Sequence, residues 1–144
     1  MSATKQSELV PPGAGVQVEL GLGRPVIKVG PPSSAQFGLI ESELPPGGGF
    51  RVAHWHEDLD EAFYVLEGEV EFLINGEWCR ATPGSTVFNP AGTVHAFRNV
   101  SERPARLLVV GPPGAVELIA SLGQHSRERW EEVHEQHRSH YASA

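Results

Sequence analysis

The strongest constraint on the fold is a succession of short β-rich runs, each closed by a glycine- or proline-rich turn. The runs recur about every 8–12 residues, which is typical of an antiparallel sandwich or a closed barrel. Asn75-Gly76 favours a tight type I′ hairpin between two of them. Strands and helices do not alternate, so a parallel α/β sheet is not expected. The expected strands are Val16–Leu20, Val26–Val29, Gln36–Leu44, Phe50–His56, Ala62–Glu67, Glu69–Ile74, Glu77–Ala81, Thr86–Phe88, His95–Val100 and Arg106–Val110.

The pattern divides the chain into three parts. Residues 1–15 are polar and then rich in proline and glycine, and we expect an N-terminal arm there. Residues 16–111 carry the strands and form the predicted barrel. Residues 112–144 predict two helices, a short one closed by Gly123 and a strongly polar one over Ser126–Tyr141. The second has a thin apolar stripe, so we expect it on the surface or against a neighbouring subunit.

Charge and composition exclude several classes of function. The net charge is −7 and the sequence has no basic patch, which argues against nucleic acid and against an anionic membrane surface as partners. No apolar run of membrane-spanning length and no signal-peptide pattern is seen, so we expect a cytoplasmic protein. Cys79 is the only cysteine, so no disulfide can form within the chain.

His54-Trp55-His56 is the first candidate for chemistry. On a strand, side chains two residues apart point the same way, about 7 Å apart, so both imidazoles could converge on one ion. On a helix the same two residues would diverge. Taken alone the pair is weak evidence, because histidines are also common as surface or core residues.

Two ordered patterns surround this pair. The first has Gly48, five residues, His54, one residue, His56, four residues, Glu61, six residues and Gly68. The second has Gly84, five residues, Pro90-Ala91-Gly92, two residues, His95, three residues and Asn99. At every fixed position and spacing they resemble the two signature motifs of the cupin superfamily. Within the superfamily, the chain resembles the small single-domain metalloenzymes, such as polyketide cyclases, and the flavonol-dioxygenase-like cupins.

The resemblance implies an all-β fold, the cupin double-stranded β-helix (a jelly-roll-like barrel), with short C-terminal helices. It also implies one divalent metal ion, whose ligands correspond by position to His54, His56, Glu61 and His95. Three imidazoles and a carboxylate suit Zn, Fe, Mn, Ni or Co, and we favour Zn. Glu61 has two alternative roles, as a fixed ligand or as a catalytic proton acceptor.

Strand parity predicts the residues around the ion. Side chains that share a face with the predicted ligands should form an apolar substrate pocket: Phe50, Val52, Phe63, Val65 and Phe97. Alternatively, these residues simply fill the barrel. The remaining histidines His134, His137 and His140 are three residues apart, and we interpret them as a polar helical surface rather than a second metal site.

Three functions fit this site. The first is a metal-dependent enzyme that stabilises the enolate of a small, largely apolar, oxygen-rich aromatic or polyketide-type substrate, as in the polyketide cyclisation and aromatisation of antibiotic biosynthesis. The second is an O₂-dependent ring-cleaving dioxygenase of the flavonol (quercetin) type. The third is a small-ligand-binding cupin without turnover. We favour the first, and we expect a homodimer with a small-molecule substrate as its other partner.

Overall fold

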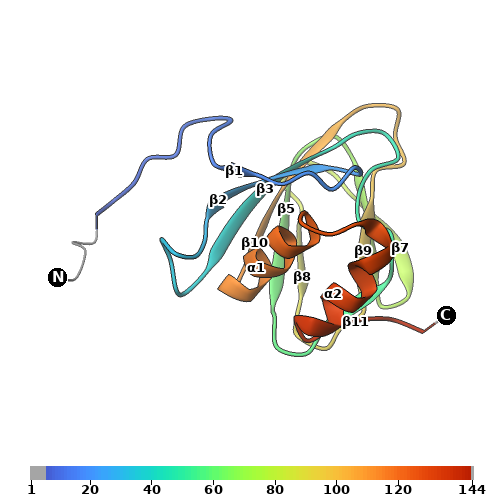
Figure 1. Ribbon diagram of the computed structural model, residues 1–144. Coiled ribbons are helices and arrows are strands. Elements are labelled where there is room, and N and C mark those ends of the chain that lie inside the picture. The colour runs from blue at the N-terminus through green and yellow to red at the C-terminus, as the bar shows by residue number, and fades with distance from the viewer. Residues whose placement is uncertain (1–5, 144) are drawn as a thin grey trace.

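A computed structural model of the protein describes residues 6–143. Part of the predicted N-terminal arm, residues 1–5, lies outside the described residues. Residues 6–15 contain no helix or strand and lead away from the barrel (Figure 1). The chain then forms mostly β-strands, followed by two short helices near its C-terminus.

The strands form three hydrogen-bonded groups. A six-stranded sheet has the order β1-β2-β3-β10-β5-β8, a three-stranded sheet has the order β7-β6-β9, and β4 pairs with β11. The first sheet comprises β1 (Val16–Gln17), β2 (Arg24–Val29), β3 (Gly38–Leu44), β5 (Glu61–Glu67), β8 (Thr86–Asn89) and β10 (Ala105–Gly111). The other strands are β4 (His54–His56), β6 (Val70–Ile74), β7 (Glu77–Ala81), β9 (Ala96–Arg98) and β11 (Ser139–Tyr141).

The two larger sheets face each other across an apolar core. Phe63 of β5 and Leu107 of β10 come from one sheet, Phe72 of β6 comes from the other, and all three are buried. The bridge between His54 and His95 joins β4 to the chain just before β9, so the smaller sheet continues into the β4-β11 pair. This closure gives the barrel that the alternating sequence predicts.

The predicted hairpin is confirmed. Antiparallel β6 and β7 meet at Ile74 and Glu77, and the two residues between them, Asn75 and Gly76, have φ of 51° and 82°. These values are the left-handed pair that a type I′ turn requires, and asparagine and glycine adopt them most readily.

The predicted strand over Phe50–His56 is too long, since β4 contains only His54–His56. The chain before β4 makes single backbone hydrogen bonds instead of a continuous strand ladder. In one of them, the Phe97 N–H donates to the Phe50 carbonyl at 3.0 Å. Gly49 has φ of 114°, and a Cβ there would lie 2.6 Å from the Phe97 carbonyl oxygen. A second bend, at Val52, interrupts the strand alternation on which the parity argument depended.

The C-terminal prediction is confirmed for one helix and wrong for the other. Helix α1 covers Pro113–Leu122 with Gly123 at its end, as expected. The predicted helix over Ser126–Tyr141 is instead a 3-10 turn at Arg127–Arg129, helix α2 (Trp130–Gln136) and strand β11. Arg138 has φ of 56°, which ends the helical backbone and turns the chain back along β4.

Helix α2 is not a surface helix. Trp130, Val133 and His134 are 7%, 0% and 2% exposed. Trp130 and Val133 form a second apolar cluster with Leu118 and Leu122 of α1. The two helices lie side by side over one opening of the barrel (Figure 1). The sequence of α2 looks polar because it contains three glutamates, and all three are exposed on the side of the helix that faces away from the cluster.

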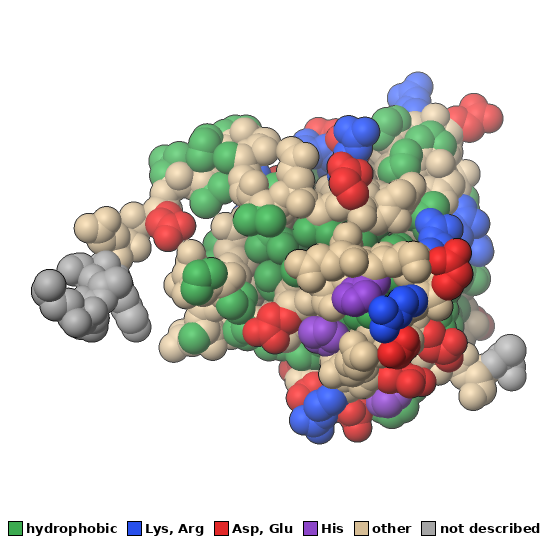
Figure 2. All heavy atoms as spheres, in the orientation of Figure 1, with side chains coloured by type: hydrophobic (Ala, Val, Ile, Leu, Met, Phe, Trp, Pro, Cys, Tyr) green, Lys and Arg blue, Asp and Glu red, His purple; other side chains and the backbone are tan. Residues whose placement is uncertain are grey.

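Outside this covered opening the surface is mixed in charge. Figure 2 shows acidic and basic side chains interspersed over the C-terminal segment, where Arg138 pairs with Glu57 at 3.3 Å and with Asp58 at 3.1 Å. None of the helices in the described part of the chain has the length and apolar character needed to cross a bilayer.

Candidate metal centre

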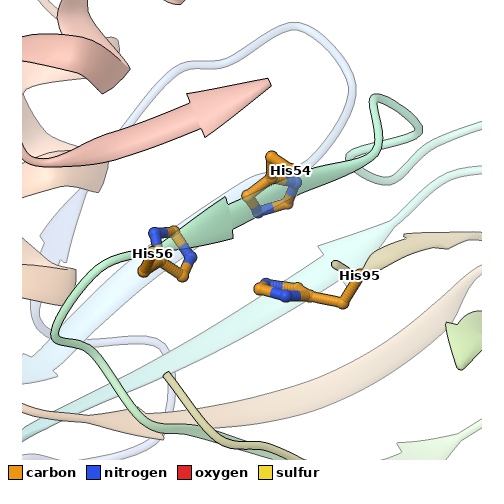
Figure 3. Close-up of side chains that lie close together, drawn as sticks. All are labelled: His54, His56 and His95. Atoms are coloured by element: carbon orange, nitrogen blue, oxygen red, sulfur yellow. The ribbon is translucent and has the colours of Figure 1, made fainter. Parts of the chain in front are cut away.

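Strand β4 places two imidazoles on one face, as the sequence predicts. His54 and His56 are 6% and 2% exposed, whereas Trp55 between them points to the other face and stacks on His140 at 4.6 Å. His95 reaches the same point because its backbone exchanges two hydrogen bonds with His54, of 3.1 and 2.9 Å. One ligand nitrogen from each of the three rings lies within 4.8 Å of the others (Figure 3).

Each ring is held by a hydrogen bond at its outer nitrogen. Nδ1 of His54 donates to the Val52 carbonyl at 2.8 Å, and Nδ1 of His95 donates to the Thr93 carbonyl at 3.0 Å. Nδ1 of His56 lies 2.6 Å from the hydroxyl oxygen of Ser139. Because carbonyl oxygens only accept, the Nδ1 protons are fixed on His54 and His95, and each Nε2 is left as a lone-pair donor for a cation.

Glu61, the first residue of β5, completes the group. Its Oε1 is 3.4 Å from Nε2 of His56, and its Oε2 is 3.3 Å from Nε2 of His95. Glu61 is 9% exposed, so the carboxylate has little contact with solvent. All four predicted ligands therefore meet in one buried place, and that they bind a metal stays a prediction.

The chemistry of this group fits a divalent cation. Within the described residues, Nε2 of His56 and Nε2 of His95 are buried with no hydrogen-bond partner. Neutral Nε2 atoms and a carboxylate all present lone pairs, and lone pairs that face each other in a buried site repel unless a positive charge lies between them. A metal ion would satisfy these atoms together, and three nitrogens with one carboxylate form a donor set suited to Zn and its neighbours.

The pKa values show how the residues share charge. Burial and the neighbouring His95 lower the pKa of His54 to about 3. Burial also lowers the pKa of His95, but the Glu61 carboxylate 3.3 Å from its Nε2 outweighs burial and leaves that pKa raised. Burial opposes ionisation of Glu61, yet His56 and His95 hold its pKa well below the ordinary value. Without metal, a proton on His95 satisfies the carboxylate, so protons and metal compete for the site.

An apolar cavity opens next to the polar group. Phe50, Phe63 and Phe97 lie on its wall, together with Leu118 and Trp130 from the C-terminal helices. His54, His56 and Glu61 line its polar end. An apolar cavity with a few converging polar atoms is the usual form of a small-molecule site. Substrate contact by the three phenylalanines stays a prediction.

Two of the predicted pocket residues are elsewhere. Val52 is 43% exposed and lies outside the cavity, because it belongs to the irregular chain before β4, where strand parity does not hold. Val65 is 0% exposed and packs in the barrel core, further along β5 than the cavity reaches. Strand parity predicts correctly which face of β5 a side chain lies on, but it does not predict how deep in the barrel that side chain lies.

Two residues at the site lie outside the two cupin-like motifs and were not predicted to be part of it. Ser139 of β11 is 0% exposed and contacts His56 from 83 positions away in the sequence. His134 is predicted on a polar surface but is buried and lines the cavity, its ring 5.7 Å from that of His54. Burial lowers the pKa of His134 to about 4. The spacing of His134 from Trp130 and Val133, which places all three on one helical face, is the signal that could have revealed it.

The family follows from a comparison with known sequences. A model of the cupin domain matches residues 40–111, half of the chain. The chain belongs to the cupin family. The match contains His54, His56, Glu61 and His95 but not the C-terminal segment that supplies Ser139 and His134.

Several known cupins are similar to this one. The quercetin 2,3-dioxygenase of Bacillus subtilis is 34% identical over 92 residues, which are 63% of this chain and 27% of that protein. The polyketide cyclase RemF from Streptomyces resistomycificus superposes with a TM-score of 0.59 at 27% identity, covering 70% of each chain. A cupin from Silicibacter pomeroyi described as a sugar phosphate isomerase gives a TM-score of 0.60 at 28% identity, covering 65% of this chain and 60% of that one.

This chain spans half or less of the length of the first curated relatives that it matches. This chain spans 27% of the dioxygenase and 50% of an uncharacterised protein from Aquifex aeolicus that is 38% identical over 61 residues.

Proposed function

We propose that this cupin is a metal-dependent enzyme that acts on a small, largely apolar compound bearing adjacent oxygen atoms. The proposal is supported by one observation, the convergence of three buried imidazoles and the Glu61 carboxylate beside an apolar cavity. In it, His54, His56 and His95 hold the ion, with Glu61 beside them. A divalent ion, when bound, supplies Lewis-acid stabilisation of negative charge on substrate oxygens.

The residues of the chain supply the remaining functions. Phe50, Phe63 and Phe97 orient an apolar ring and exclude water from it. The Glu61 carboxylate lies beside the imidazoles of His56 and His95, where it is placed to accept a proton from a carbon next to a carbonyl group. The chemistry favoured is therefore proton removal followed by ring closure, as in polyketide cyclisation.

A phosphate-bearing substrate is disfavoured. Of the described residues that line the cavity, none is lysine or arginine. A phosphate group transferred into such a site would lose its hydration without gaining a cationic or guanidinium partner. The similarity to a protein described as a sugar phosphate isomerase is therefore not taken to indicate a phosphate-bearing substrate.

Oxygen-dependent ring cleavage is the second candidate, and the observation that favours it is the 34% identity to quercetin 2,3-dioxygenase. The two candidates differ in their need for a redox-active ion and O₂. Protein loaded separately with Zn²⁺ and Fe²⁺ should be tested with a linear tetraketone, which can close to an aromatic ring with loss of water, and with quercetin.

We expect the Zn²⁺ form to produce aromatic product from the tetraketone at equal rates in air and under argon, measured by absorbance and mass spectrometry. The Glu61→Gln variant should lose this activity, because an amide cannot accept the proton. Quercetin consumption with O₂ uptake only in the Fe²⁺ form would favour the second candidate. No turnover of either compound by any metal form would contradict the proposed class.

Ser139→Ala tests how the site is supported. The change removes the partner of Nδ1 on His56, so the ring is no longer held in orientation and its basicity falls. We expect metal affinity to fall by about tenfold, the lower end of the effect seen when such outer partners are removed. Competition with a chromophoric chelator measures this, and Ser33→Ala, at an exposed position, is the matched control. Unchanged affinity in Ser139→Ala would show that the hydroxyl does not support the ligand.

A further inference from the structure

His134 is a polar group in an otherwise apolar part of the cavity wall. Its ring lies 5.3 Å from Phe50 and 5.0 Å from Tyr141, and only 2% of the residue is exposed. It belongs to α2, outside the residues that match the cupin domain. A buried imidazole that only filled space could be replaced by an apolar side chain at lower desolvation cost.

The hydrogen bonding of His134 fixes which of its nitrogens carries the proton. Nδ1 lies 2.7 Å from the carbonyl oxygen of Trp130, one turn earlier in α2. A carbonyl oxygen only accepts, so Nδ1 carries the proton, and burial disfavours a second proton on the ring. Nε2, on the opposite edge of the ring, is therefore left as a hydrogen-bond acceptor, on a residue that lines the cavity.

His134 is close to the triad without joining it. The group of converging ligand atoms found in the described chain consists of His54, His56 and His95. The ring of His134 stands edge-on to that of His54, with 5.7 Å between centroids. A molecule bound at the triad through two oxygens would thus bring its next ring substituent near Nε2 of His134.

We propose that His134 is a specificity-determining residue that accepts a hydrogen bond from a hydroxyl group next to the metal-binding oxygens of the ligand. This inference rests on the proposed function, because it takes the ligand to bind at the triad. It adds the substrate class: hydroxylated rings with a third oxygen adjacent to the chelating pair. Analogues that lack this hydroxyl leave Nε2 buried and unpaired, which is the most effective basis for rejecting a ligand.

Tropolone and α-hydroxytropolone provide the test. Both are compact apolar rings with a chelating oxygen pair, and only the second has a further hydroxyl beside that pair. Their dissociation constants are measured by absorbance titration into Zn²⁺-loaded protein, at a pH where both are anionic. We expect the wild-type protein to bind α-hydroxytropolone about fivefold to tenfold more tightly, as one additional buried hydrogen bond allows.

Two variants at position 134 distinguish the role of Nε2 from that of Nδ1. In His134→Asn the amide can still donate to Trp130 but is too short to replace Nε2, so we expect the preference to disappear while tropolone affinity and zinc content stay unchanged. In His134→Gln the amide oxygen can take the place of Nε2, and part of the preference should return. Tyr141→Phe, which removes a neighbouring hydroxyl, should keep the preference.

Each alternative outcome is distinct. Equal affinity of the wild-type protein for the two tropolones, or a preference retained in His134→Asn, would overturn the role of His134 alone. Loss of zinc from His134→Asn would overturn it in favour of a ligand role. Failure of tropolone to bind to the zinc-loaded wild-type protein would count against the proposed function itself.

Discussion

His95→Ala is expected to lose its bound metal and all turnover. His95 provides the one imidazole of the group that comes from outside β4, and without it two rings and a carboxylate remain on one side of the ion. Removing even an outer partner of a ligand costs about 10–100-fold in affinity, so loss of the ligand should exceed about 100-fold. Elemental analysis after dialysis measures metal content, and circular dichroism reports whether the barrel is intact.

The matched control is His137→Ala, at a partly exposed histidine at the end of α2. It should keep one metal ion per chain and full activity. The barrel of His95→Ala should still form, because the pairing between His95 and His54 uses backbone atoms alone. A His95→Ala variant that retains stoichiometric metal would show that the ion is held elsewhere, and the site assignment would be wrong.

The second large effect is a loss of stability of the metal-free protein in mild acid. The folded pKa values of His54 and His134 are about 3 and about 4, against an ordinary value of 6.5. Between those values the unfolded chain binds protons that the folded chain does not, so stability is full above pH 6.5 and falls as pH drops below it. Each histidine contributes about 2 kcal/mol to the loss between pH 6.5 and about pH 5, at roughly 1.4 kcal/mol per pKa unit.

Other groups do not cancel this effect in the same window. The raised pKa of His95 has the opposite sign, so the stability it provides is complete below pH 6.5 and is lost only as pH rises above it. The lowered pKa of Glu61 matters below its ordinary value of 4.5. Urea unfolding of chelator-treated protein at pH 7 and pH 5 gives the two free energies of unfolding. His134→Asn should lose about half of the pH dependence, and a slope unchanged by that variant would contradict the assignment.

Local sequence signals were sufficient for most of the barrel strands and for the pair His54 and His56, whereas Glu61 and His95 were predicted from the resemblance to the cupin motifs. Strand period places His54 and His56 together, and the Asn75-Gly76 turn fixes a hairpin, because both depend on neighbours in the chain. The same rule fails at Val52, where the chain bends just before β4 begins. It also fails for Ser139, since whether these residues continue α2 or pair with β4 is decided by an edge strand far away in the sequence.

His134 shows the same limit in another form. A helix with three glutamates is predicted to be exposed to solvent. The inner face of α2 is buried only because the helix packs over the opening of the barrel. Propensity and charge describe a helix by itself, whereas burial depends on the surface against which it packs.

The helices and last strand of the described chain have a consequence for how this protein could change over evolution. The predicted metal ligands lie in one stretch, and His134, which lines the cavity, lies in another, beyond Gly111. Substitutions in the second stretch can therefore alter which molecules are accepted while the ion remains in place. Recognition can diversify among descendants of this gene without the reactive centre having to be rebuilt.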